Sequence, residues 1–74
     1  MTTATRYELA IWDEKVREWS TYGYGEPVIE DNDDAVRYAA ESLRTLAEYT
    51  DARLCLLTME QDEQGWKVSL REEI

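Results

Sequence analysis

The spacing of apolar residues changes twice along this chain. In "RYELAIW", Tyr7, Leu9 and Ile11 occupy alternate positions, which is the pattern of a strand with one buried face. From Asp33 onward the apolar residues recur every three or four positions, as they do along one face of an amphipathic helix. Alternation returns near the end of the chain. We therefore expect one helix between two pairs of strands.

The predicted elements follow the order ββαββ and define an α+β domain. Glycine and proline punctuate them: Gly23, Gly25 and Pro27 end the second strand, because glycine weakens a strand and proline cannot donate to its ladder. In "QDEQG", Gly65 suits the left-handed position of a short hairpin loop. The expected strands span residues 6–12, 18–24, 53–60 and 66–72, and the expected helix spans residues 33–49.

The predicted helix has two distinct faces. Its apolar face is expected to pack on the sheet through Val36, Ala40, Leu43 and Ala47. Its opposite face alternates in charge at spacings of three and four residues, which favours weak ion pairs along the helix surface. We expect that face to be solvated and nearly neutral; it consists of Asp34, Arg37, Glu41, Arg44 and Glu48.

One helix can cover only one face of a four-stranded sheet. We expect Trp66, Val68 and Leu70 to share one apolar face of the last strand. The third strand is apolar on both sides, so it is expected to be central, with its second face covered by Trp or Tyr side chains or used for self-association. The preferred order is 2-1-3-4, fully antiparallel. The alternative is a ubiquitin-like β-grasp with strands 1 and 4 central and parallel.

Length and charge limit the possible functions. A chain of 74 residues is expected to form a single domain, residues 1–74, with no deep substrate pocket. Its net charge of −9 repels nucleic acid and anionic membranes and favours a basic partner protein. The opening "MTTATRYELA" lacks the layout of a signal peptide, and no apolar run could cross a bilayer. We therefore expect a cytoplasmic protein that binds neither nucleic acid nor membrane directly.

The sequence argues against an enzyme or a cofactor. It has no histidine, which is the commonest general base and metal ligand, and it lacks the familiar catalytic motifs. The single cysteine, Cys55, lies in an apolar run and is expected to be a buried structural thiol. A calcium loop starting at Asp31 would place Ala35 and Val36 where a ligand and a glycine belong. We expect no catalytic residues, no cofactor and no metal.

The candidate site is a concentration of acidic residues in two segments. Helix capping and the helix dipole explain two or three of them. The predicted topology brings both segments to one end of the domain, as a solvated surface or a partner-binding site. Tyr22 and Tyr24 precede the first segment and are expected to be apolar anchors beside it. The acids are Glu26, Glu30, Asp31, Asp33 and Asp34 in the first segment, and Glu60, Asp62 and Glu63 in the second.

The segments "EDNDDAVRYAAESL" and "ARLCLLTMEQDEQGWKVSLREE", together with the acid count, resemble the small accessory proteins of bacteriophages and mobile elements, and among them anti-CRISPR inhibitors. The resemblance implies a DNA mimic, an inhibitor whose carboxylates occupy a basic nucleic-acid-binding site on a host protein such as a CRISPR effector subunit, in the host cytoplasm if a phage encodes it. The alternative function is a structural or regulatory homodimer formed through the spare apolar face of the third strand. The expected state is therefore a monomer or a weak homodimer.

Overall fold

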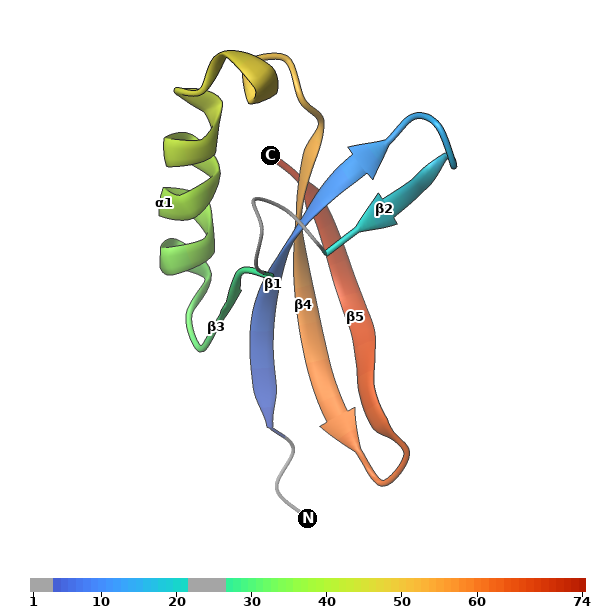
Figure 1. The fold of residues 1–74 in the computed structure, drawn as a ribbon. Helices are drawn as coiled ribbons and strands as arrows, with labels where there is room; N and C mark the ends of the chain where they lie inside the picture. Colours follow the sequence, from blue (N-terminus) through green and yellow to red (C-terminus); the bar gives the residue numbers. More distant parts are fainter. Residues whose placement is uncertain (1–3, 22–26) are drawn as a thin grey trace.

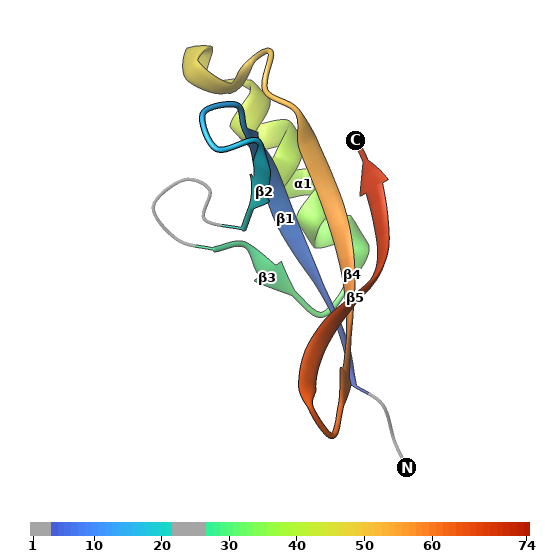
Figure 2. The same ribbon diagram turned by 90° about the vertical axis from the view of Figure 1, so that its right-hand side faces the viewer.

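The computed structural model describes residues 4–21 and 27–74 (Figure 1). Their strands form one sheet in the order β2-β1-β4-β5, with β3 pairing β1 off this path, and every pairing is antiparallel. Figure 2 shows that the helix α1 lies on one side of the sheet only. The elements are β1 (Thr5–Asp13), β2 (Glu18–Ser20), β3 (Ile29–Glu30), α1 (Asp33–Arg44), the 3-10 turn η1 (Ala47–Tyr49), β4 (Leu54–Asp62) and β5 (Gly65–Glu73).

The expected α+β fold, one helix on an antiparallel sheet, is confirmed at that level. The expected element order ββαββ is incomplete, because β3 is an additional strand of two residues. It pairs with β1 at Tyr7 and Glu8, whereas β2 pairs with β1 from Ile11 to Asp13, so the two short strands share one edge of β1. The four expected strands lie in the order β2-β1-β4-β5, which is the expected order 2-1-3-4 renumbered, and the difference is the additional strand β3 beside β1. The β-grasp alternative is wrong, because β1 pairs antiparallel with β4 and not with β5.

The helix begins where the sequence indicates and ends earlier. The side chain of Asn32 accepts a hydrogen bond from the Ala35 amide at 2.8 Å, which caps the first turn. At the other end, the Thr45 hydroxyl and amide both donate to the Ser42 carbonyl, and Leu46 is extended. The predicted continuation to residue 49 is therefore wrong, and Ala47, expected in the core, is exposed. The break turns Leu46 and the 3-10 turn back toward the core.

The core has two layers, one on each face of β4. On the helix side, Leu9 of β1 packs with Leu54 and Leu56 of β4 against Val36, Ala40 and Leu43 of α1. On the other side, Trp19 and Trp66 pack over a second buried cluster of Ala10, Cys55, Leu57 and Met59. The prediction that tryptophan side chains cover the second apolar face of β4 is confirmed.

A β-bulge divides β5 into two halves. Met59 pairs with Val68 and Thr58 pairs with Leu70, so Ser69 is an extra residue, and its hydroxyl donates to the Thr58 carbonyl at 3.2 Å. The extra residue moves Leu70 to the opposite face from Val68. The expectation that Trp66, Val68 and Leu70 share one face is therefore wrong at Leu70. Both Val68 and Leu70 remain exposed, at 40% and 59%.

The hairpin between β4 and β5 follows the sequence prediction. Gly65 has a φ of 113°, the positive value that favours glycine, and the Gln64 amide donates to the Asp62 carboxylate at 2.7 Å.

Replacing Leu43 by alanine should lower the free energy of unfolding by about 2 to 5 kcal/mol, because the cut removes buried methyl groups and leaves a cavity. Leu43 is only 7% exposed in the helix-side core layer. The Leu70→Ala variant is the matched control, since the same atoms leave an exposed side chain. Denaturant unfolding of both variants checks this prediction, and equal losses would contradict the core assignment.

Candidate acidic interface

The structure places the predicted site residues in two groups. The first lies at the junction between β3 and α1, and consists of Glu30, Asp31, Asp33 and Asp34. The second lies on the β4–β5 hairpin, and consists of Glu60, Asp62 and Glu63. Glu26, Tyr22 and Tyr24, which were predicted to belong to the same site, lie outside the described residues.

Both groups lie toward the end of the molecule to which the β4–β5 hairpin extends, but at different levels (Figure 1). Tyr7 of β1 pairs with Glu30 on one side and with Thr58 on the other, so these three residues share one level of the sheet. Asp62 follows four residues after Thr58, which corresponds to about 13 Å along an antiparallel strand. That separation exceeds the screening length of about 8 Å at physiological salt. Asp62 and Glu63 are therefore largely screened from Glu30, whereas Glu60, two residues after Thr58, lies closer to its level.

The hairpin group is partly neutralised by a cation from β5. Lys67 lies 3.0 Å from the Asp62 carboxylate, and this contact, with the Gln64 amide, lowers the pKa of Asp62. Glu60 and Glu63 are exposed. This ion pair was not predicted from the sequence. Lys67 lies outside the acidic segment, and only the hairpin turn brings its ammonium group to the Asp62 carboxylate.

Both helix arginines reach the end of β5. Arg37 contacts Glu72 at 2.7 Å and Asp33 at 3.7 Å, and its pKa is raised chiefly by the hydrogen bond to Glu72. Arg44 donates to the main-chain oxygen of Ile74 at 2.6 Å. The acids of the expected stripe are exposed and its arginines partly exposed, but the two arginines contact the end of β5 rather than the acids of the stripe.

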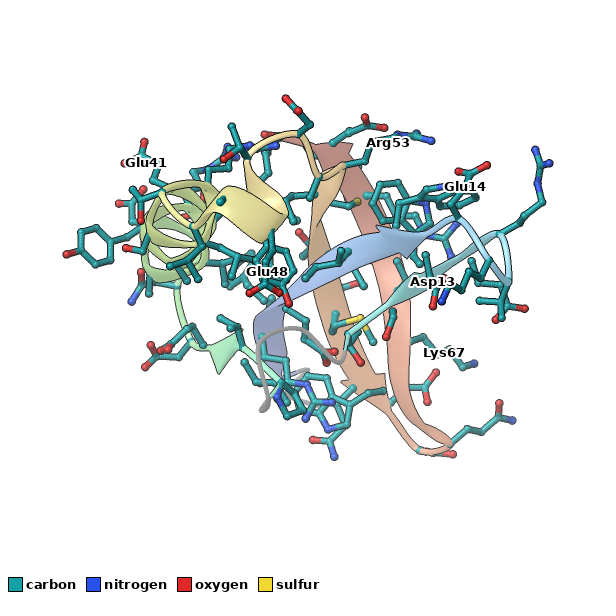
Figure 3. The ribbon with its side chains drawn as sticks, turned by 45° about the horizontal axis from the view of Figure 1, so that its top comes forward. Asp13, Glu14, Glu41, Glu48, Arg53 and Lys67 are labelled. Atoms are coloured by element: carbon teal, nitrogen blue, oxygen red, sulfur yellow. The ribbon has the colours of Figure 1, made fainter. Side chains whose placement is uncertain are left out.

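The outer side of α1 is left with acidic residues around an exposed tyrosine. Asp34, Tyr38 and Glu41 follow one another at spacings of four and three residues and so share one side of the helix. Tyr38 is 73% exposed, and Figure 3 shows Glu41 pointing away from the sheet. We call Asp31, Asp34, Tyr38 and Glu41, with Glu30 at the rim, the junction surface. Tyr38 was missed from the sequence, although its spacing from the two acids was visible there.

The four acids of the junction surface have no ion pair among residues 4–21 and 27–74. Within the same residues, the only hydrogen bond to their side chains comes from the side-chain amide of Asn32, at 3.3 Å from an Asp31 oxygen. An apolar groove of about 530 Å³ lies beside Glu30, between β3 and α1, and is lined in part by Val28, Ile29 and Leu46. The described part of this surface thus combines unpaired carboxylates with apolar and aromatic contact area.

On the face of the sheet opposite α1, two acidic side chains form ion pairs with arginines of the same face. Glu8 is 5% exposed and pairs with Arg6 at 2.9 Å, and Arg6 lies 4.1 Å from the centre of the Trp66 ring. Arg53 makes two hydrogen bonds to Glu73, at 2.7 and 3.1 Å, and lies over Trp12 at 5.0 Å. These acids are neutralised in place. The excess negative charge therefore lies elsewhere.

The thiol and the possible metal ligands of the described residues are further candidates for site residues. Burial raises the pKa of the Cys55 thiol, so it stays protonated beneath the tryptophan layer. Among the described residues, no three acidic or cysteine side chains lie close enough together to hold a metal ion. Neither helix in the described part of the chain has the length and apolar character needed to cross a bilayer.

Comparison with known protein-family models, with curated protein sequences and with solved structures gives no match for this chain.

The stability of the parent protein and of a Glu73→Gln variant should differ most at neutral pH. The hydrogen bond from Arg53 lowers the pKa of Glu73 below its ordinary value of 4.5. A carboxylate with a lowered folded-state pKa stabilises the fold above its unfolded-state pKa, and this stabilisation is lost as pH falls through the folded-state value. The difference in melting temperature should therefore shrink as pH falls below 4.5. Melting curves across this range check it, and a constant difference would contradict the ion pair.

Proposed function

We propose that this protein is a non-enzymatic, cytoplasmic binding protein whose junction surface occupies a basic, nucleic-acid-binding site on a host protein. The resemblance noted in the sequence implies a CRISPR effector subunit as that partner, and hence inhibition by DNA mimicry. The observation that carries the proposal is the orientation of the two helix arginines. Because Arg37 and Arg44 are engaged with β5, the acids on the outer side of α1 are uncompensated.

The charge arrangement favours association with a basic surface. Asp31, Asp34 and Glu41 are exposed, so their field extends into solvent and can steer a cationic partner toward this side of the molecule. Charge complementarity of this kind acts mainly on the association rate and on specificity. The outward field of the junction surface exceeds that of the hairpin, where Lys67 offsets part of the acidic charge.

Tyr38 supplies what an acidic surface alone lacks. A solvated surface has no need of a large aromatic side chain 73% exposed in the middle of an acidic stripe. Tyrosine is frequent among the residues that dominate binding energy, because its ring offers a large contact area at little entropic cost. An arginine of the partner can also place its guanidinium over the ring while it pairs with the flanking carboxylates. Tyr38 therefore favours a protein contact over simple solvation.

The direct test is competition with DNA. Purified, guide-loaded CRISPR effector complexes are mixed with labelled target DNA, and the fraction bound is measured by gel shift with and without this protein. We expect the protein to abolish DNA binding by a susceptible effector. The protein alone should not shift the DNA, because two polyanions gain nothing from counterion release. If no effector in the panel loses DNA, mimicry against these complexes is wrong.

Two triple-amide variants locate the active surface. The junction variant carries Asp31→Asn, Asp34→Asn and Glu41→Gln, and it should associate with the effector about tenfold or more slowly and with less salt dependence. The control variant removes the same number of charges at Glu18→Gln, Glu60→Gln and Glu63→Gln, and should associate nearly as fast as the parent. Surface plasmon resonance at two salt concentrations measures both. If the control variant is the slower of the two, the contact lies on the hairpin instead.

A further inference from the structure

The outer edge of β5 is the one long edge that the described residues leave open. β5 is last in the strand order, and within the described part of the chain β4 is the only strand that pairs with it. The opposite edge of the sheet is divided between β2, of three residues, and β3, of two. Figure 1 shows β5 on the side of β4 away from β1 in the lower half of the view. A strand of nine residues with unpaired backbone groups is a template for pairing with another strand.

We propose that this edge pairs antiparallel with the same edge of a second copy of the chain, and so joins the two sheets into one. The proposal concerns a different surface from the junction surface and does not depend on the function proposed for it. It also differs from dimerisation through the second face of β4, which Trp19 and Trp66 cover.

The backbone groups available for pairing follow from the alternation of an antiparallel ladder. The Ile74 amide donates to the Leu54 carbonyl of β4 at 2.9 Å, so the backbone groups of Ile74 point toward β4. Residues at odd spacings from Ile74 point the opposite way, so Arg71 and Glu73 turn their backbone N–H and C=O outward. In the other half of β5, Lys67 pairs with Glu60. Glu60 lies at an even spacing from Leu54, so its backbone N–H and C=O point toward β5, as those of Leu54 do, and the backbone groups of Lys67 point toward β4. The neighbours of Lys67 therefore turn outward. The bulge shifts this alternation, and the outward residues are Trp66, Val68, Arg71 and Glu73.

One register satisfies all four outward residues at once. When Val68 of one copy lies opposite Arg71 of the second copy, Trp66 lies opposite Glu73 of the second copy, and the twofold symmetry repeats both pairs. The bulge of each strand then lies opposite the bulge of the other, so neither interrupts the joint ladder. A bulge normally protects an edge by spoiling its hydrogen-bond spacing. Here it restricts pairing to a partner with the same irregularity, which a second copy provides.

The side chains agree with this register. Lys67 lies opposite Glu72 of the second copy on the helix side of the sheet, because Lys67 pairs with Glu60 and Glu72 with Leu56 on that same face of β4. Opposite charges in cross-strand positions stabilise a sheet. The exposed side chains of Val68 and Leu70 flank the symmetry axis and are covered on pairing. The strand carries two basic and two acidic residues, so this edge is balanced within a chain of net charge −9.

Sedimentation equilibrium over a wide concentration range, at physiological ionic strength, tests the proposal. The parent protein should pass from one to two chains as concentration rises. The Val68→Pro variant deletes an outward amide that β4 does not use, so the fold should survive while dimerisation weakens about tenfold or more, since each dimer loses two hydrogen bonds. The Val68→Thr variant keeps the amide and the side-chain shape and should dimerise nearly as well as the parent.

Circular dichroism shows whether the Val68→Pro variant is folded. If it is not, a charge exchange between two residues of β5 tests the proposal instead. Lys67→Glu and Glu72→Lys should each weaken the dimer, and combining them should restore it, because the combination recreates opposite charges in the predicted register. Each substitution also breaks an ion pair within the chain, to Asp62 or to Arg37, so dimerisation is compared only among variants whose circular dichroism matches the parent. A parent protein that stays a single chain at the highest concentration overturns the proposal. So does a folded Val68→Pro variant that dimerises as tightly as the parent, or a charge exchange that restores nothing.

Discussion

The two-sided burial of β4 is the constraint on which the rest of this structure depends. Its successive residues Leu54, Cys55, Leu56 and Leu57 are all buried, so apolar area must be covered on both faces of one strand. A domain of this size has only one long helix to offer, and α1 covers one face. The other face is covered by tryptophan side chains from β2 and β5. Each of these tryptophans has an arginine over its ring, Arg6 over Trp66 and Arg53 over Trp19. Covering the second face therefore engages two basic residues.

The positions of the engaged arginine side chains determine where acidic side chains remain without a basic partner. Arg6 and Arg53 hold the tryptophan layer, while Arg37 and Arg44 tie the helix to the end of β5. Half of the eight basic side chains are thereby fixed in structural contacts, and three of them, Arg6, Arg37 and Arg53, pair with acidic side chains. Among the described residues, the acids left without an ion pair include those on the outer side of α1. The junction surface is thus a consequence of how the core is covered.

Much of the fold could be predicted from the sequence, because periodicity reports burial directly. The change in apolar spacing located β1, β4 and α1 to within a few residues at most boundaries, and the two-sided pattern of β4 identified its central place. Periodicity could not reveal the bulge, because one extra residue in β5 leaves the local alternation of Trp66, Val68 and Leu70 intact. It could not reveal the helix end either, since Leu46 fits the helical pattern and the extended conformation equally well.

The candidate site was harder to predict, because charge depends on partners that are distant in sequence. The acids were visible, but their neutralisation was not: Lys67 approaches Asp62 across a hairpin, and Arg37 approaches Glu72 across the domain. A stripe that alternates in sign along a helix suggests pairs within the helix, each worth only about 0.2 to 0.5 kcal/mol. A hydrogen-bonded contact to a second element holds an arginine more strongly, especially when it also anchors a strand end. When a helix lies near a sheet edge, its charged side chains should first be considered as partners of charged or main-chain groups at that edge. Only the helix charges left without such a partner should be counted as surface charge.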